Sequence, residues 1–207
     1  PLVRGGDHSI AIGSVAGGAS TGDRGICWFD AHGDYNTPAT TPSGNVHGMS
    51  LAAILGEGEF ADTEWAHSGV DPANVALVGV RDLDDGEREA LRASPVSVYP
   101  MAAIDERGIG PVIDDALETV SEDTEGVHLS LDLDWLDPGE APGVGTPVRG
   151  GATYREAHTA MERVAERVGG DLRSIGIVEV NPILDRENHT AELAVELLAS
   201  ALGKRTY

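Results

Sequence analysis

The chain has 207 residues, with 35 Asp and Glu against 14 Lys and Arg, so its formal net charge is −21. Such an acidic chain lacks the basic surface that a nucleic-acid-binding protein needs to neutralise phosphates. An apolar content of 41% excludes a disordered acidic tail and predicts one globular domain over residues 1–207.

Short apolar runs alternate with longer segments of helical period, which is typical of an α/β fold with a mostly parallel sheet. The expected strands are residues 25–29, 74–80, 96–99, 127–133 and 175–180. The expected helices are residues 8–16, 47–55, 84–93, 110–121, 153–168 and 188–202. The helix over 153–168 has the clearest start signal, because Thr153 and Glu156 form a capping box.

The cationic residues comprise one lysine, Lys204, and 13 arginines, a bias that favours a salt-adapted protein over an ordinary acidic enzyme. With Cys27 as its one cysteine the chain has no intrachain disulfide, which favours a reducing, cytoplasmic compartment. No run of about 18 apolar residues exists, so no membrane span is expected. The chain starts at Pro1 and runs directly into a glycine-rich motif, so we expect that an N-terminal portion of the domain is missing.

Polar side chains gather where the predicted strands end. Asp30 follows the first strand, Asp82 the second and Asp134 the fourth, while Glu179 and Asn181 end the last. Ligands of open α/β sheets bind in the crevice at the carboxyl ends of the strands, so a site is expected there.

Two motifs in these turns carry potential metal ligands. Asp30, His32 and Asp34 share one side of an extended strand exit, and Asp132 and Asp134 repeat the pattern. With His8 they supply four carboxylates and two imidazoles, which suit two divalent cations that share bridging carboxylates. Hard oxygen and imidazole ligands without thiolate favour Mn²⁺ over structural zinc, although Co²⁺, Ni²⁺ and Fe²⁺ remain open.

The other histidines fit this pattern less well. His128 has the strand parity of Asp132 but lies four residues away, about 13 Å along a strand, and is left out of the site. His67, His158 and His189 lie outside any motif and are interpreted as structural.

Three segments resemble the signatures of the ureohydrolase (arginase and agmatinase) family, of bacterial or archaeal type. They are Gly5-Gly6-Asp7-His8-Ser9, Asp30-Ala31-His32-Gly33-Asp34-Tyr35-Asn36, and Ser130-Leu131-Asp132-Leu133-Asp134 with Asp137-Pro138 and Ala141-Pro142-Gly143. The resemblance runs from residue 2 to Tyr207. It implies a three-layer α/β/α fold with a mostly parallel sheet and two Mn²⁺ ions per subunit. Trp135 departs from the pattern, because many relatives have a small residue beside this aspartate.

The resemblance implies roles for the ligands and for three catalytic residues. His8 and Asp34 would hold one Mn²⁺, His32 and Asp134 the other, with Asp30 and Asp132 bridging. The reaction would be hydrolysis of a guanidinium group by a hydroxide that bridges the metals. Asp34 would pass a proton to the leaving amine, Glu179 would pair with the guanidinium, and His47 would relay protons to solvent.

Two loops match the arginase branch of the family, which implies L-arginine as substrate and L-ornithine and urea as products. Asn36, Thr41 and Ser43 would bind the substrate carboxylate, and Asp82, Asp84 and Glu87 its ammonium group. Thr146 matches a residue that lines the metal site. The resemblance also implies a homotrimer or homohexamer and a place in arginine metabolism and the urea cycle.

Two alternatives remain open at this stage. One is an agmatinase or another guanidino-compound ureohydrolase with the same metals, which Asn36, Asp82 and Asp84 would discriminate. The other is an inactive metal-binding subunit, which the complete ligand set disfavours.

Overall fold

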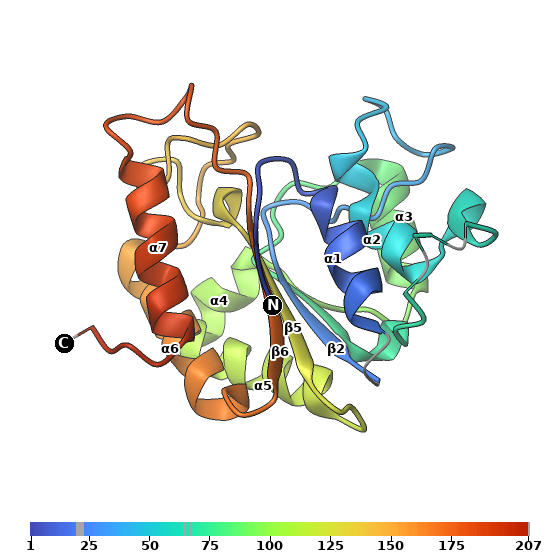
Figure 1. The fold of residues 1–207 in the computed structure, drawn as a ribbon. Coiled ribbons are helices and arrows are strands. Elements are labelled where there is room, and N and C mark those ends of the chain that lie inside the picture. Colours follow the sequence, from blue (N-terminus) through green and yellow to red (C-terminus); the bar gives the residue numbers. More distant parts are fainter. Residues whose placement is uncertain (20–22, 64, 67, 207) are drawn as a thin grey trace.

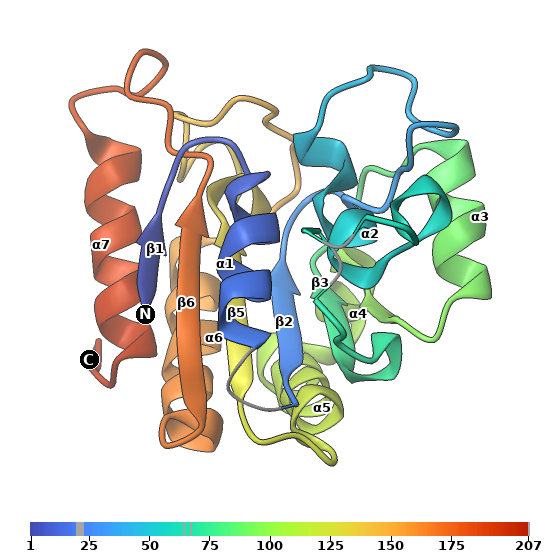
Figure 2. The same cartoon turned by 45° about the vertical axis from the view of Figure 1, so that its right-hand side comes forward.

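The structure is a computed structural model that describes residues 1–19, 23–63, 65–66 and 68–206. Six strands form one sheet in the order β1-β6-β5-β2-β3-β4. They are β1 (Leu2–Arg4), β2 (Gly25–Phe29), β3 (Val75–Val78), β4 (Ser97–Tyr99), β5 (Val127–Asp132) and β6 (Leu172–Val178). Every neighbouring pair is parallel, so the carboxyl ends of the strands share one edge, which is uppermost in Figure 2.

Helices cover both faces of the sheet (Figure 1), which confirms the predicted three-layer α/β/α fold. One face carries α1 (Ile10–Ala19), α2 (Ser50–Leu55) and α3 (Asp85–Ala93). The other carries α4 (Met101–Arg107), α5 (Ile109–Ser121), α6 (Tyr154–Val168) and α7 (His189–Ala201). Single 3₁₀ turns lie at η1 (His47–Met49), η2 (Gly58–Phe60), η3 (Pro72–Asn74) and η4 (Leu133–Trp135). None of the helices in the described residues combines the length and the apolar character that crossing a membrane would require.

The two cores follow from the alternation of side chains along the central strands. In β2, Cys27 and Phe29 face the core beneath α5, whereas Ile26 and Trp28 face the core beneath α1 and α2. All four side chains are fully buried, as expected for a strand that is covered on both faces. The Cys27 thiol is free, and burial raises its pKa far above the ordinary value, so it belongs to the core rather than to a reactive site.

The predicted elements all exist; the strand expected at 25–29 has the predicted ends, and the others have shifted ends. The helix expected at 8–16 is α1, and the one expected at 47–55 divides into η1 and α2. Among the strands and α-helices, two were not predicted, the edge strand β1 and the short helix α4. The strand expected at 175–180 begins at Leu172 and stops at Val178, because Glu179 adopts a left-handed backbone with φ of 65°.

The sheet order creates the crevice. From β2 the chain continues outward to β3 and β4, then returns so that β5 lies against the other side of β2. Phe29 pairs with Leu131, so the residues that follow the ends of β2 and β5 lie side by side. A reversal of strand order at the carboxyl edge is where α/β proteins bind ligands.

Candidate metal centre and pocket

The two ligand segments leave the sheet through turns rather than as extended strands. Asp34 has a φ of 49°, in the left-handed region, and Asp134 lies within the 3₁₀ turn η4. The Asp132 carboxylate accepts a hydrogen bond from the Asp134 backbone N–H at 2.7 Å, which stabilises that turn. The expected convergence of the side chains is confirmed, but the extended backbone proposed as its cause is wrong.

One half of the cluster surrounds His8, which lies in the turn before α1. Its Nδ1 atom lies 3.1 Å from Asp30 Oδ2, 3.3 Å from Asp34 Oδ2 and 3.0 Å from Asp132 Oδ2. All four side chains are buried. Nδ1 of His8 and Oδ2 of Asp34 make no hydrogen bond to any described residue. One ring nitrogen cannot satisfy three carboxylate oxygens, so this arrangement fits a cation in their midst.

The other half surrounds His32, whose Nδ1 lies 3.4 Å from Asp30 Oδ1 and 3.0 Å from Asp134 Oδ2. Asp30 thus directs one carboxylate oxygen to each half. Ligand atoms of His8, Asp30 and Asp34 form one group that could hold a metal ion, and those of Asp30, His32 and Asp134 form a second. Two cations that share Asp30 fit these donors.

The cluster contains more carboxylates than imidazoles, and this excess of negative charge shifts the pKa values of its members. Burial raises the pKa of Asp34, and repulsion from Asp30 raises it further. Burial and repulsion from Asp134 likewise raise the pKa of Asp132. Burial lowers the pKa of His32, but its contacts with Asp134 and Asp30 outweigh this and raise it to about 12. Burial also raises the pKa of Asp30, but the contacts of its carboxylate with His32 and His8 outweigh this and lower the pKa. Either protons or cations must therefore neutralise these carboxylates.

Three contacts that orient the ligands were not anticipated from the sequence. The Nε2 atom of His8 lies 2.8 Å from Ser130 Oγ, and the His8 ring stacks on Trp28 with centroids 4.1 Å apart. The Trp28 indole N–H also donates to Asp30 Oδ2 at 3.0 Å. Ser130 precedes Asp132 with the same strand parity, and Trp28 stands in the same relation to Asp30. That parity was the available signal.

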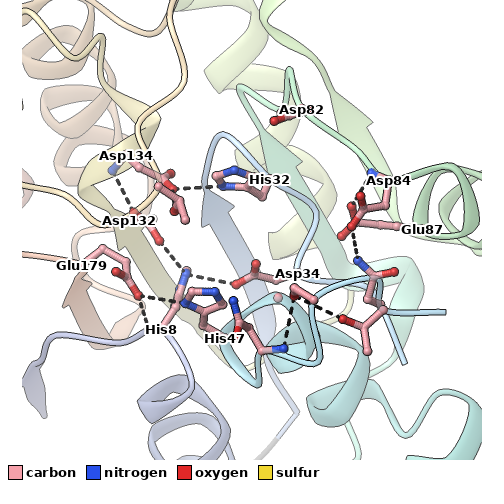
Figure 3. Close-up of a pocket in the computed structure, with 16 residues that line it drawn as sticks. His8, His32, Asp34, His47, Asp82, Asp84, Glu87, Asp132, Asp134 and Glu179 are labelled. Atoms are coloured by element: carbon pink, nitrogen blue, oxygen red, sulfur yellow. Dashed lines mark hydrogen bonds and ion pairs between the residues drawn. The ribbon is translucent and has the colours of Figure 1, made fainter. Parts of the chain in front are cut away.

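A pocket opens above this cluster (Figure 3). Fifteen of its lining residues carry polar or charged side chains, and they include every predicted site residue except the buried Asp30. The lining comprises His8, His32, Asp34, Asn36, Thr41, Ser43, Asn45, His47, Gly48, Asp82, Asp84, Glu87, Asp132, Asp134, Thr146 and Glu179. Asn45 and Gly48 had not been singled out, although both belong to the loop that carries His47.

The two predicted specificity loops meet in this pocket. The Asn36 amide nitrogen donates to Asp84 Oδ2 at 2.9 Å. Asp84 is also the N-cap residue of α3, and its backbone N–H donates to Glu87 Oε2 at 3.3 Å. Capping and a place in the pocket are therefore compatible. Burial raises the pKa of Glu87 to about 7, although hydrogen bonds from the backbone of Tyr35 and Asp84 oppose the shift.

Glu179 and His47 lie on the opposite wall, near His8. Glu179 Oε1 accepts a hydrogen bond from the His8 backbone N–H at 2.7 Å and lies 3.9 Å from His47 Nδ1. His47 is also 3.6 Å from Asp7, whose side chain is 60% exposed. The imidazole thus lies between the pocket and solvent. Burial raises the pKa of Glu179, against the hydrogen bond from His8.

Residues around Asp134 complete the site. The Thr146 hydroxyl donates to Asp134 Oδ2 at 3.1 Å, and the Ala31 backbone N–H donates to Asp134 Oδ1, also at 3.1 Å. Trp135 is buried in the core and does not line the pocket. Its indole fills the space above Gly79, where a Cβ would lie 2.0 Å from the indole nitrogen. A large residue at 135 is thus accommodated behind the site.

The remaining histidines are structural where they are described. His128 Nδ1 lies 2.7 Å from Ser174 Oγ, and His158 Nδ1 lies 2.8 Å from Ser200 Oγ, both in buried positions. His189 is the first residue of α7. His67 lies outside the described residues.

Comparison with known proteins decides the family. The family model described as Arginase family matches residues 1–203. The chain belongs to the arginase family. It is 52% identical over 208 aligned residues to an arginase of Bacillus caldovelox, an alignment that spans 99% of this chain and 69% of the relative.

Solved structures of the arginase family agree in fold. The native structure of Bacillus caldovelox arginase superposes with a TM-score of 0.94 at 50% identity, over 100% of this chain and 70% of that one. Entamoeba histolytica arginase in complex with L-ornithine gives a TM-score of 0.90 at 32% identity, over 98% of this chain and 69% of that one. The buried carboxylate and imidazole cluster thus belongs to a hydrolase of the arginase family.

Proposed function

We propose that this chain hydrolyses L-arginine to L-ornithine and urea. The observation that carries the proposal is the contact between Asn36 and Asp84, which joins two polar loops beside the buried ligand cluster. A substrate with a guanidinium group at one end and an amino-acid group at the other requires both features. The complex of the Entamoeba histolytica relative with L-ornithine supports the same chemistry.

The ligand cluster would hold two Mn²⁺ ions. His8 and Asp34 would bind one ion and His32 and Asp134 the other, with Asp30 and Asp132 as bridges; the distances around His8 and His32 support this division. Oxygen and imidazole donors without thiolate support manganese. Divalent cations held there would supply the nucleophile, because they lower the pKa of a coordinated water towards neutrality.

Three side chains would handle the guanidinium and the protons. Glu179 would pair with the guanidinium, and its anchoring by the His8 backbone keeps one carboxylate oxygen fixed. Asp34 would transfer a proton to the leaving amine. His47, between the exposed Asp7 and Glu179, would exchange protons with solvent.

The two loops would recognise the far end of the substrate. Asn36, Thr41 and Ser43 offer an amide and two hydroxyl groups to a carboxylate. Asp82, Asp84 and Glu87 would receive the ammonium group, with Thr146 lining the metal side of the pocket. If these residues did not bind the substrate carboxylate, the alternative function would be that of an agmatinase or another guanidino-compound ureohydrolase.

The test is urea release from L-arginine and from agmatine, compared with and without Mn²⁺ in molar KCl, and then after chelation. Mn²⁺-dependent release from L-arginine, with little from agmatine, is the expected result. Release from agmatine alone would be consistent with the metal centre but would overturn the carboxylate-binding role of Asn36. Release that survives chelation would overturn the metal centre.

The proposal extends to the setting of the enzyme. Residues 1–207 would form one catalytic domain that assembles as a homotrimer or homohexamer in the cytoplasm. A net charge of −21 with a single lysine supports adaptation to high salt, and the buried free Cys27 supports a reducing compartment. Sedimentation in dilute and in molar KCl tests both assembly and salt dependence.

A further inference from the structure

The Arg81 guanidinium bonds to six main-chain carbonyl groups. Arg81 lies three residues beyond the end of β3, is half-buried, and precedes Asp82, which lines the pocket. Its five N–H groups donate at 2.8 to 3.3 Å, and the two on Nη2 are shared among three acceptors. The acceptors are the backbone oxygens of Gly79, Asp134, Trp135, Leu136, Val148 and Arg149. Every donor of the side chain is thus used on backbone.

These acceptors belong to the segments that shape one half of the metal centre. Nη2 donates at 2.8 Å to the carbonyl of Asp134, a residue of the turn η4 that presents its carboxylate to His32. It donates also to Val148, two residues beyond Thr146, whose hydroxyl contacts that carboxylate. The Arg81 backbone N–H donates at 2.9 Å to the carbonyl of Ala31, between Asp30 and His32.

The space around the Arg81 side chain fits a guanidinium group, which is planar and has five hydrogen-bond donors. A Cβ on Gly151 would lie 2.6 Å from Nη2 of Arg81 and 2.4 Å from the Leu136 carbonyl carbon, so only glycine admits the guanidinium here. A lysine ammonium has three donors on a flexible stem and cannot reach acceptors spread over three segments. Buried carbonyl groups left without donors would make the turn move.

We propose that Arg81 is a positioning residue for the His32 and Asp134 half of the metal centre. It fixes the Asp134 carboxylate through the main chain of η4 and fixes η4 against the His32 loop. Neither His8 nor Asp34 is among the hydrogen-bond partners of Arg81, so the half that they form should keep its geometry when the guanidinium is removed. This inference rests on the proposed metal site, whereas it does not depend on which guanidino compound is hydrolysed.

The experiment measures Mn²⁺ binding by the whole chain with Arg81→Lys and Arg81→Met, by titration of metal-free protein in molar KCl without substrate. In both variants one Mn²⁺ should bind as in the wild type, and the affinity for the second should fall about 10- to 100-fold, the usual effect of losing a residue that orients a ligand. At saturating Mn²⁺, kcat should fall while KM for L-arginine changes little.

Two controls separate positioning from general stability. Arg88→Lys alters an exposed arginine paired with Asp85, and Arg163→Lys alters a half-buried arginine paired with Asp114 far from the pocket. Both should bind two Mn²⁺ normally, even if Arg163→Lys lowers Tm. Equal weakening of both ions, or none, in the Arg81 variants would overturn the proposal. Two Mn²⁺ ions bound by a wild type that releases no urea would overturn the proposed function alone.

Discussion

The Asn36 side-chain amide donates a hydrogen bond to Asp84 Oδ2 at 2.9 Å, from a loop 48 residues earlier in the chain. Thr40 donates in turn to Asn36 Oδ1 at 3.0 Å, which fixes the amide so that its nitrogen faces Asp84. One amide hydrogen remains free for a ligand, because the group has two donors. The two loops therefore form one hydrogen-bonded wall of the pocket.

Removing either partner of this contact should impair use of L-arginine. Asn36→Ala and Asp84→Ala should each raise KM, with a loss of about 1.5–3 kcal/mol in kcat/KM for a lost bond to a charged group, or roughly 10- to 100-fold. The loss of transition-state free energy in the double variant should be smaller than the sum of the losses in the two single variants, because the two side chains are in contact. Steady-state kinetics of the four proteins with L-arginine measure this coupling.

Agmatine serves as the control substrate for the same set. Because agmatine lacks the carboxylate, Asn36→Ala should reduce its turnover less than that of L-arginine. Equal losses for both substrates would contradict the assignment of Asn36 to the carboxylate.

Glu179→Gln should lower kcat/KM for L-arginine by about 10- to 100-fold, through loss of the charge-assisted bond to the guanidinium. The amide oxygen of glutamine can still accept the hydrogen bond from the His8 backbone N–H, which Glu179 Oε1 receives at 2.7 Å. Mn²⁺ content should therefore stay at the wild-type value. Kinetics together with metal analysis test the pair of outcomes, and loss of metal would instead assign Glu179 to the support of His8.

Asp30→Asn should disturb both halves of the metal centre, because its two oxygens face His8 and His32 separately. Asp34→Asn should disturb chiefly the His8 half, because Oδ2 of Asp34 lies 3.3 Å from Nδ1 of His8. Metal analysis after gel filtration should find less than one Mn²⁺ per chain in the first variant and close to one in the second. Identical metal content in the two variants would argue against Asp30 as the shared ligand.

Stability should fall in acid partly through His128. Burial, with the nearby charge of Arg24, lowers the pKa of this histidine to about 3, against 6.5 for the ordinary side chain. Between these two pKa values His128 is protonated in the unfolded chain and neutral in the folded chain. The free energy of unfolding therefore decreases as pH falls from 6.5, by at most about 1.4 kcal/mol per pH unit.

His128→Asn removes that contribution, so the variant should show a shallower decrease in stability between pH 6.5 and pH 4. Denaturant titrations of the chelated proteins in molar KCl provide the comparison, since both proteins share the titration of the other groups. Parallel curves for the wild type and the variant would show that His128 does not titrate in this way.

The sequence predicted the mostly parallel α/β sheet and the ligand cluster because both depend on side-chain type and spacing, whereas the three-layer arrangement followed from the resemblance to the ureohydrolase family. Buried strands such as β2 and β3 are continuous apolar runs, and aspartates at the ends of β2 and β5 are not expected in an apolar core. The strand β1 has three residues with exposed Leu2, and α4 has seven, so neither carries a periodic pattern long enough to recognise.

Backbone geometry was beyond the reach of the same reasoning. Asp34 and Glu179 adopt left-handed conformations, at φ of 49° and 65°, which cannot be predicted from the residue type. Arg81 was missed because its partners are carbonyl groups of six residues, and a carbonyl carries no information in a sequence. The one available signal was an arginine placed directly after the apolar run of residues 74–80.

The ligands of the centre come from three distant stretches of chain, at residue 8, at residues 30–34 and at residues 132–134. They meet where β5 pairs with β2 and where β1, which precedes His8, pairs with β6. A growing chain on the ribosome therefore has no complete centre until β6 (Leu172–Val178) has emerged and paired with β1. Metal uptake follows the longest-range event in the fold, and the bound ions would then favour the finished sheet over every shorter intermediate.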